Sequence, residues 1–133
     1  MSIEQRRAEL AEAVTAELSG VQGLPRTVTV DPYRAPSPAP WTGWLELDQT
    51  DTEGCTYGEV RCTFDLPLLI AADRTDFEPV QDVLTVPFMQ AIAAVGGRGV
   101  TVKPTVEAVG NTAIYALTAR FVTEALILES GVA

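Results

Sequence analysis

A run of regular alternation between apolar and polar residues lies near the middle of this 133-residue chain. Across 59–70 one set of alternate positions is apolar: Val60, Cys62, Phe64, Leu66, Leu68 and Ile70. The positions between them begin with Glu59, Arg61, Thr63 and Asp65. Because successive side chains of a strand point to opposite faces, the pattern predicts a long strand with one covered face, as antiparallel sheets have. Pro67 cannot donate to the ladder, which suggests an edge position or a bulge near the end of this strand.

Residues 2–19 have the features of an amphipathic helix. Ser2 and Gln5 have the spacing of a capping box, and a glycine at position 20 provides a stop. Apolar residues recur at helical spacing at Ile3, Leu10, Val14 and Leu18. We expect the outer surface of this helix to carry Glu4, Arg7, Glu9, Glu12 and Glu17.

A second helix is predicted over residues 74–95. Its core-facing stripe steps by three or four residues through Phe77, Val80, Leu84, Phe88, Ile92 and Val95. Pro79 is tolerable in the first turn, whereas Pro87 is interior and is expected to kink the helix near Val86. The stripe keeps its phase across Pro87, which favours a kink over a break, and Gly96-Gly97 ends the helix.

Further strands are predicted at 27–30, 41–47, 100–106 and 112–123, the last two joined by a turn at 108–111. Strands paired as hairpins with helices over one face make an α+β fold. We therefore expect a single two-layer domain over 1–123, a mostly antiparallel sheet with two helices packed on one face. The tail, 124–133, contains Leu126 and Leu128 and is expected to dock on a neighbouring subunit, extend the sheet or fray.

The segment 31–44 is rich in proline, with prolines at 32, 36, 38 and 40, and it holds both tryptophans of the chain. It is long for a connection and can be neither a helix nor a central strand. A stiff extended arm with large aromatic rings suits docking on another protein. The alternative is that the tryptophans cap the chain's own core and the prolines form a rigid solvent loop. The interface candidates from the arm and the tail are Tyr33, Arg34, Pro36, Pro38, Trp41, Trp44, Leu126 and Leu128.

Composition gives no support to catalysis or to metal or cofactor binding. The chain has no histidine, which removes the usual acid–base group, the usual activator of nucleophiles and the commonest zinc ligand. Cys55 and Cys62 match neither a redox nor a metal-ligand spacing, and we expect both to be reduced in a cytoplasmic product. The acidic turn 48–54 misses the register of a calcium loop, so a solvated hairpin loop is favoured over a metal site.

The net charge is −9, and Lys103 is the only lysine. Binding to nucleic-acid phosphates needs clustered positive charge, of which the sequence has none. An acidic balance would suit a surface past which DNA slides, although solubility is the simpler explanation. No apolar run approaches the length of a membrane span, and the amino terminus does not have the pattern of a signal peptide.

In its layout the chain resembles the tail terminator, or tail completion, proteins of long-tailed bacteriophages, especially those that infect actinobacteria. The resemblance covers roughly residues 3–123. It rests on the helix 3–18, a Gly-Leu-Pro with a short strand, the proline-bearing loop and the long strand 58–66. It continues through an Asp-bearing helix start at 73–76, the strand 100–106 with Pro104 and the Tyr-Ala-Leu at 115–117.

The resemblance implies a structural virion protein that is not an enzyme and needs no cofactor. Copies, six in that family, would form a homo-oligomeric ring that caps the major tail tube protein. The ring would meet the head-side connector or stopper protein, and DNA would pass through it as cargo. Two alternatives remain: a head–tail connector or adaptor of the same virion, and a small-ligand-binding α+β domain with Trp41, Trp44 and Tyr115 around a pocket.

Overall fold

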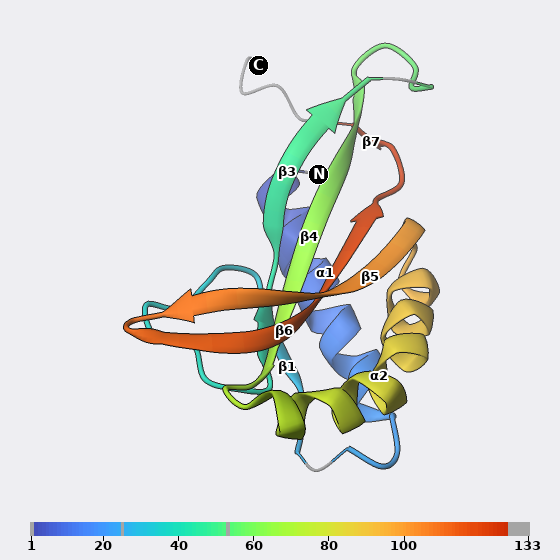
Figure 1. Cartoon of the computed structure of the whole chain (residues 1–133). Helices are drawn as coiled ribbons and strands as arrows, with labels where there is room; N and C mark the ends of the chain where they lie inside the picture. Colours follow the sequence, from blue (N-terminus) through green and yellow to red (C-terminus); the bar gives the residue numbers. More distant parts are fainter. Residues whose placement is uncertain (1, 25, 53, 128–133) are drawn as a thin grey trace.

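The computed structural model describes residues 2–24, 26–52 and 54–127. Within these ranges the chain forms two helices and a seven-stranded sheet, an α+β domain with the predicted two-layer arrangement (Figure 1). In chain order the elements are α1 (Ile3–Ser19), β1 (Thr29–Asp31), β2 (Thr42–Trp44), β3 (Glu46–Asp51), β4 (Glu59–Ala71), α2 (Arg74–Ala94), β5 (Arg98–Val109), β6 (Thr112–Val122) and β7 (Leu126–Ile127).

The predicted long strand is β4, and it is the centre of the sheet. The strand order is β1-β2-β4-β6-β5, with β3 and β7 also paired to β4. Four strands therefore share β4: β2 and β3 follow one another along one side, and β6 and β7 along the other. All of these pairs are antiparallel, and only β1 and β2 are parallel among the described strands.

The alternation of β4 is confirmed by the core. Cys62, Phe64, Leu66, Leu68 and Ile70 are all buried on the face that carries both helices. From the helices the predicted stripes meet them, with Leu10, Val14 and Leu18 of α1 and Phe77, Leu84, Phe88 and Ile92 of α2. Burial of so many large apolar side chains, at about 25 cal/mol per Å² removed from water, is the main stabilising term.

The amino-terminal helix begins as predicted. Ser2 accepts from the Gln5 backbone N–H at 3.0 Å, and the Gln5 side chain accepts from the Ser2 N–H at 2.8 Å. This reciprocal pair satisfies two amide groups that a helix start leaves without intrahelical partners. The expectation for Arg7 was wrong, however, because its side chain is half-buried between α1 and the sheet rather than on the outer surface.

Helix α2 runs without interruption through both prolines, as predicted. Figure 1 shows that its two halves point in different directions, which agrees with the missing amide and the steric demand of Pro87. The helix ends at Ala94, and Gly96 just beyond its C-cap has a φ of 97°, which few other residues adopt readily. Gly97 then donates its N–H to the Ile92 carbonyl at 2.9 Å and turns the chain into β5.

The prediction for Pro67 was half right. A register shift between Leu69 and Ala71 places an irregularity near the end of β4, but β4 is central rather than at an edge. Pro67 lies opposite the point where β2 ends and β3 begins, so the ladder on that side is already interrupted at Leu45. A missing donor is tolerated at such a gap.

A second, smaller apolar cluster lies on the face opposite the helices. It consists of Trp44, Leu69, Ile114 and Ala116, with Val109 packed against it. The β5–β6 hairpin is longer than predicted and turns tightly after Val109, where Gly110 has a φ of 61°. The far end of this hairpin contributes Ile114 and Ala116 of β6 to the second cluster. This end of the sheet is therefore apolar on both faces.

Gly97 provides a test of the packing between the end of α2 and the sheet. A Cβ there would collide with Cγ2 of the fully buried Ile92 and lie 2.9 Å from the Ile92 carbonyl oxygen. Gly97→Ala should therefore lower the free energy of unfolding by about 1–3 kcal/mol in urea titrations. Gly20→Ala is the matched control, because the nearest atom to its Cβ is 3.5 Å away. Equal effects at the two positions would contradict this account.

Candidate interaction surfaces

The proline arm, defined here as residues 32–41, connects β1 to β2. Because these two strands are parallel, the chain must travel back along the sheet before the second strand can begin. In most proteins a helix makes that crossover, whereas here an extended proline-rich segment does. The topology therefore gives the length of this loop a structural cause that is independent of any partner.

Arg7 of α1 fixes the beginning of the arm. Its guanidinium carbon lies 4.4 Å from the centre of the Tyr33 ring and 5.9 Å from that of Phe64. Its Nη1 donates to the carbonyls of Leu45 at 3.3 Å and Pro32 at 3.5 Å. One side chain thus joins helix, arm and sheet through a cation–π contact and backbone acceptors. Sequence reasoning missed this role because it depends on contacts 25 to 38 residues away.

Arg34 fastens the arm to the opposite face of the sheet. Its Nη2 donates to the Ala108 carbonyl in β5 at 2.6 Å, and its guanidinium carbon lies 4.9 Å from the centre of the Trp44 ring. Its Nη1 is 4.0 Å from Oε2 of Glu107. The arm therefore closes over the second apolar cluster, and Arg34 is mainly a contact within the chain rather than a free docking residue.

Both tryptophans are buried, so the alternative in which they cap the core describes them. Trp41 is 9% exposed on the helix side, and its backbone N–H donates to the Leu69 carbonyl at 2.6 Å. Trp44 is 1% exposed in the second cluster, and its indole N–H donates to Glu46 at 2.7 Å. Pro38 is buried as well. These three residues offer no surface to a partner, and of the arm candidates Tyr33, Arg34 and Pro36 remain exposed.

The tail extends the sheet, which was one of the three expected outcomes. Leu126 and Ile127 pair with Val60 and Glu59 as β7, and Leu126 is 3% exposed within the main core. Leu126 is thus a core residue, whereas Ile127 is 66% exposed. The remaining candidate, Leu128, lies outside the described residues.

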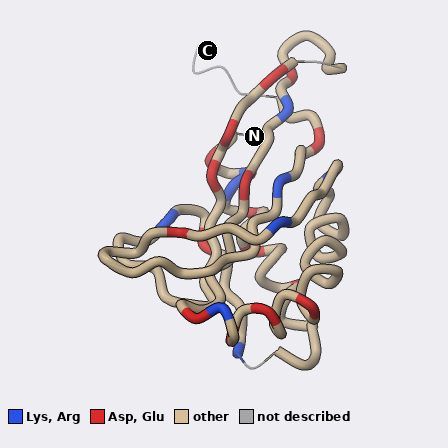
Figure 2. The backbone as a smooth tube through the Cα atoms, viewed as in Figure 1, with Lys and Arg blue, Asp and Glu red and all other residues tan. Residues whose placement is uncertain are grey.

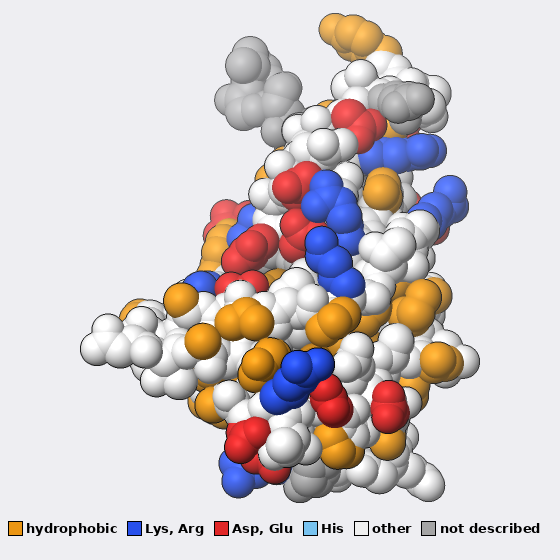
Figure 3. All heavy atoms as spheres, viewed as in Figure 1, with side chains coloured by type: hydrophobic (Ala, Val, Ile, Leu, Met, Phe, Trp, Pro, Cys, Tyr) orange, Lys and Arg blue, Asp and Glu red, His pale blue; other side chains and the backbone are white. Residues whose placement is uncertain are grey.

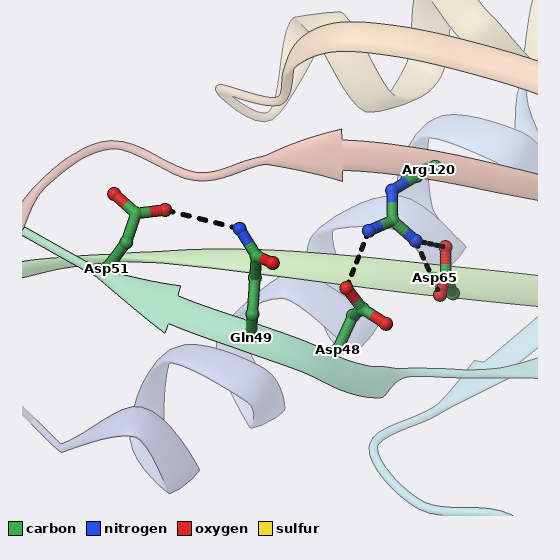
Figure 4. A network of polar contacts seen from close by, with 5 residues as sticks. All are labelled: Asp48, Gln49, Asp51, Asp65 and Arg120. Atoms are coloured by element: carbon green, nitrogen blue, oxygen red, sulfur yellow. Dashed lines mark hydrogen bonds and ion pairs between the residues drawn. The ribbon is translucent and has the colours of Figure 1, made fainter. Parts of the chain in front are cut away.

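The sheet face opposite the helices is polar beyond the second cluster. Arg120 of β6 reaches across β4: its Nη2 lies 2.5 Å from Asp48, and its Nη1 lies 3.2 Å and 3.3 Å from the two oxygens of Asp65 (Figure 4). The hydrogen bond to Asp48 makes the largest contribution, followed by the charges of Asp65 and Asp48, and together they raise the pKa of Arg120 above its ordinary value. Asp48, from the predicted acidic turn, is therefore part of an ion-pair network.

Asp51, the other described carboxylate of the acidic turn, does not converge with Asp48. Asp51 lies farther along β3, where it accepts from the Gln49 amide at 3.5 Å (Figure 4). Glu53 is outside the described residues. Among the residues that the structure describes, no group of three or more carboxylate, cysteine or histidine side chains is placed to hold a metal ion.

The β3–β4 hairpin ends in an exposed aromatic residue that sequence reasoning missed. Tyr57 has a relative exposure of 106% in the turn between the two strands, and Figure 1 shows this turn projecting from the body of the domain. The available signal was a tyrosine inside a polar, glycine-containing turn. Other exposed large apolar side chains are Tyr33 on the arm, Val83 and Val86 on α2, Val106 on β5 and Ile127 on β7.

A shallow groove lies between α2 and β5. It has a volume of about 290 Å³, and Phe77 and Tyr115, stacked with ring centres 5.5 Å apart, are among its lining residues. This is just below the usual range for ligand pockets. The predicted pocket of Trp41, Trp44 and Tyr115 is not formed, because Trp44 packs in the cluster opposite the one that contains Trp41 and Tyr115.

The sequence matches no protein-family model, and a comparison with curated proteins finds no similar sequence. None of the described helices has the length and apolar character needed to cross a bilayer. Function is therefore inferred from the fold, from the surfaces described above and from the resemblance in layout.

Removal of Arg34 should release the arm from the second apolar cluster. Arg34→Ala loses a charged hydrogen bond and a cation–π contact, so we expect a loss of about 1–3 kcal/mol in the free energy of unfolding. Amide exchange should also become faster near Ala108. Arg74→Ala is the control, because its exposed pair with Glu78 within α2 should contribute less than about 0.5 kcal/mol.

Glu107 predicts a pH dependence of stability. Burial, followed by repulsion from Glu46, raises the pKa of Glu107, and Arg34 opposes the shift only in part. The ionised form is thus disfavoured in the folded state, and this cost begins to fall as the pH drops through the folded pKa and is gone below the lower pKa of the unfolded chain. Glu107→Gln should therefore be more stable than the parent at pH 7, by up to about 1 kcal/mol, and the difference should shrink at acidic pH. A less stable Glu107→Gln variant at pH 7 would contradict this.

Proposed function

We propose that this protein is a structural joint of a long-tailed bacteriophage, a tail terminator whose copies form a ring. The ring caps the tail tube, where it contacts the major tail tube protein and meets the head-side connector, and DNA passes through its lumen. In this role the protein transforms no molecule and belongs to the neck of the virion.

The observation that supports this role best is where the exposed apolar side chains lie. Tyr33 is on the arm, Tyr57 at a projecting hairpin tip and Ile127 on β7, and none of the three lines the groove between α2 and β5. Exposed aromatic and aliphatic residues at separate projecting points suit contacts with several neighbours. They would be unusual in a ligand-binding domain, where such residues gather around one cavity.

The charge distribution is compatible with DNA that passes without being gripped. Acidic residues occur on α1, β3 and the beginning of α2 (Figure 2). Four glutamates of α1 are exposed: Glu4, Glu9, Glu12 and Glu17. In the view of Figure 3 basic side chains gather near the middle, with acidic side chains along one border of this group. Phosphates would meet repulsion at the exposed glutamates of α1, as a channel for moving DNA requires.

A head–tail connector or adaptor of the same virion is the closest alternative. It differs in the rings that it contacts rather than in its chemistry. The exposed apolar side chains named above would suit its contacts equally well. The groove between α2 and β5 is the observation that favours a ligand-binding domain, but it is small and open.

Particles assembled without this protein test the proposal. Electron microscopy should show tails of abnormal length that fail to join heads, because nothing stops tube growth. A connector would instead leave tails of normal length beside heads that lack them. Intact infectious virions would rule out both roles.

The hairpin tip gives a finer test that leaves the fold intact. Tyr57→Ser removes a fully exposed ring, so the stability should change by less than about 0.5 kcal/mol. Joining of tails to heads should nevertheless fall in complementation assays. Val83→Ser on the outer surface of α2 is the matched control, and equal loss from both would argue against a specific role for the tip.

A further inference from the structure

Among the described strands β1, β3, β5 and β7 pair on one side only. Thr15 of α1 hydrogen-bonds to the Val30 backbone of β1, however, and β7 has only two residues, so β3 and β5 have the long open edges. β3 pairs with β4 alone, and β5 pairs with β6 alone. In the pairing order β3-β4-β6-β5 these two strands lie on opposite sides of β4. Unpaired strand edges present rows of backbone donors and acceptors, and an assembly can satisfy them with another strand.

The directions of the two strands allow copies to join head to tail. β3 is antiparallel to β4, β4 to β6 and β6 to β5, so β3 and β5 run in opposite directions. Figure 1 shows that β5 crosses β3 and β4 at a steep angle, so a rotation axis that relates two copies must be inclined to both strands. With such an axis, β5 of the second copy would meet β3 of the first copy in antiparallel orientation, with the helices of both copies on the same face. Such a heterologous contact closes into a ring.

The charges on the two edges are complementary. β3 carries Glu46, Asp48 and Asp51 and no basic residue, so two β3 edges would place carboxylates against each other. β5 begins with Arg98 and carries Lys103 immediately before Pro104. Lys103 forms no ion pair with the described residues, and Arg98 has only a distant, exposed one with Glu124 at 3.9 Å.

One register pairs both charges and matches the faces at its Lys103 end, whereas Gln49 and Val100 in its middle face different sides because the two irregularities are not aligned. The stretch 98–103 and β3 each have six residues and one irregularity in their pairing. If Glu46 lies opposite Lys103, Asp51 lies opposite Arg98, and Leu47 lies opposite Val102. Leu47 and Val102 both pack against the main core, on the helix side. Glu46 and Lys103 both line the hollow on the opposite face.

We propose that β3 of one copy pairs with residues 98–103 of a second copy in this register, so that the sheets become continuous around the ring. Lysine, proline and irregular pairing normally protect an edge from indiscriminate pairing. Here Pro104 limits the contact to six residues, and the acidic edge supplies the partner for the two cations. The inference builds on the proposed ring but concerns only how the copies join.

A cysteine pair tests the register in the full-length chain. Glu46→Cys with Lys103→Cys, in a Cys55→Ser background, should give interchain disulfides under mild oxidation, seen as a ladder on non-reducing gels. Cys62 is fully buried and stays in place. Glu46→Cys with Arg98→Cys is the control: five residues out of register is about 17 Å, too far for a disulfide, so its ladder should be at least about tenfold weaker. Equal ladders, or bridges confined to monomers, would overturn the proposal.

Charge reversal adds a readout without cysteine. Asp51→Lys should weaken self-association roughly fivefold in sedimentation experiments, and the double variant Asp51→Lys/Arg98→Glu should restore it. Failure of the double variant to recover would count against the register.

The two proposals fail separately. Rings that form but do not crosslink through Glu46→Cys and Lys103→Cys would overturn the edge contact and leave the tail role standing. If the rings do crosslink but virions assembled without the protein are intact, the tail role would be overturned and the edge contact would stand. A chain that stays monomeric at high concentration and yields no ladder would overturn the edge contact.

Discussion

The pairing of β4 on both sides is the constraint on which the rest of the structure depends. Thirteen residues of one strand serve four others, two along each side. Its even-numbered side chains form the floor of the main core, and Leu69, from the other set, enters the second cluster. Because both sides of β4 are occupied and α1 bonds to the backbone of β1, the long open edges among the described strands are those of β3 and β5, and contact with other proteins through strands is expected there.

The sequence predicted the elements whose pattern is local. Alternation in β4, the capping box of α1 and the stripe of α2 each encode a periodicity together with a start or stop signal, and all three are present. Arg7 was assigned to solvent because helical position alone was considered. Its place is set by Leu45, Pro32 and the rings of Tyr33 and Phe64, all distant in sequence. A long cationic side chain can lie along apolar surface and still find acceptors, so charge by itself is a weak predictor of exposure.

The arm shows why composition misleads about interfaces. Prolines and aromatic rings in an extended segment are typical of docking peptides, but they equally suit a crossover that must span two parallel strands without a helix. Trp41 and Trp44 lie at the end of that crossover, on opposite faces of the sheet, and each fills a separate cluster. That β1 and β2 are parallel was not visible in the sequence, because strand direction is decided by long-range pairing. For Tyr57 the sequence offers only a weak signal, a tyrosine inside a polar, glycine-containing turn, and its full exposure is seen only in the structure.

A sheet edge recognises a partner through backbone groups that every chain has, so its specificity must come from side chains. On β3 this specificity comes from excluding wrong partners. Three carboxylates on a six-residue strand disfavour pairing with another β3 and with acidic segments generally. In a protein with a net charge of −9, a stretch such as 98–103, with two cations and no acid, is uncommon. The general acidity that keeps copies apart in solution therefore makes this basic stretch a favoured partner for the acidic edge. By this reasoning rising salt should weaken repulsion and attraction together, so self-association should depend less steeply on ionic strength than the net charge suggests.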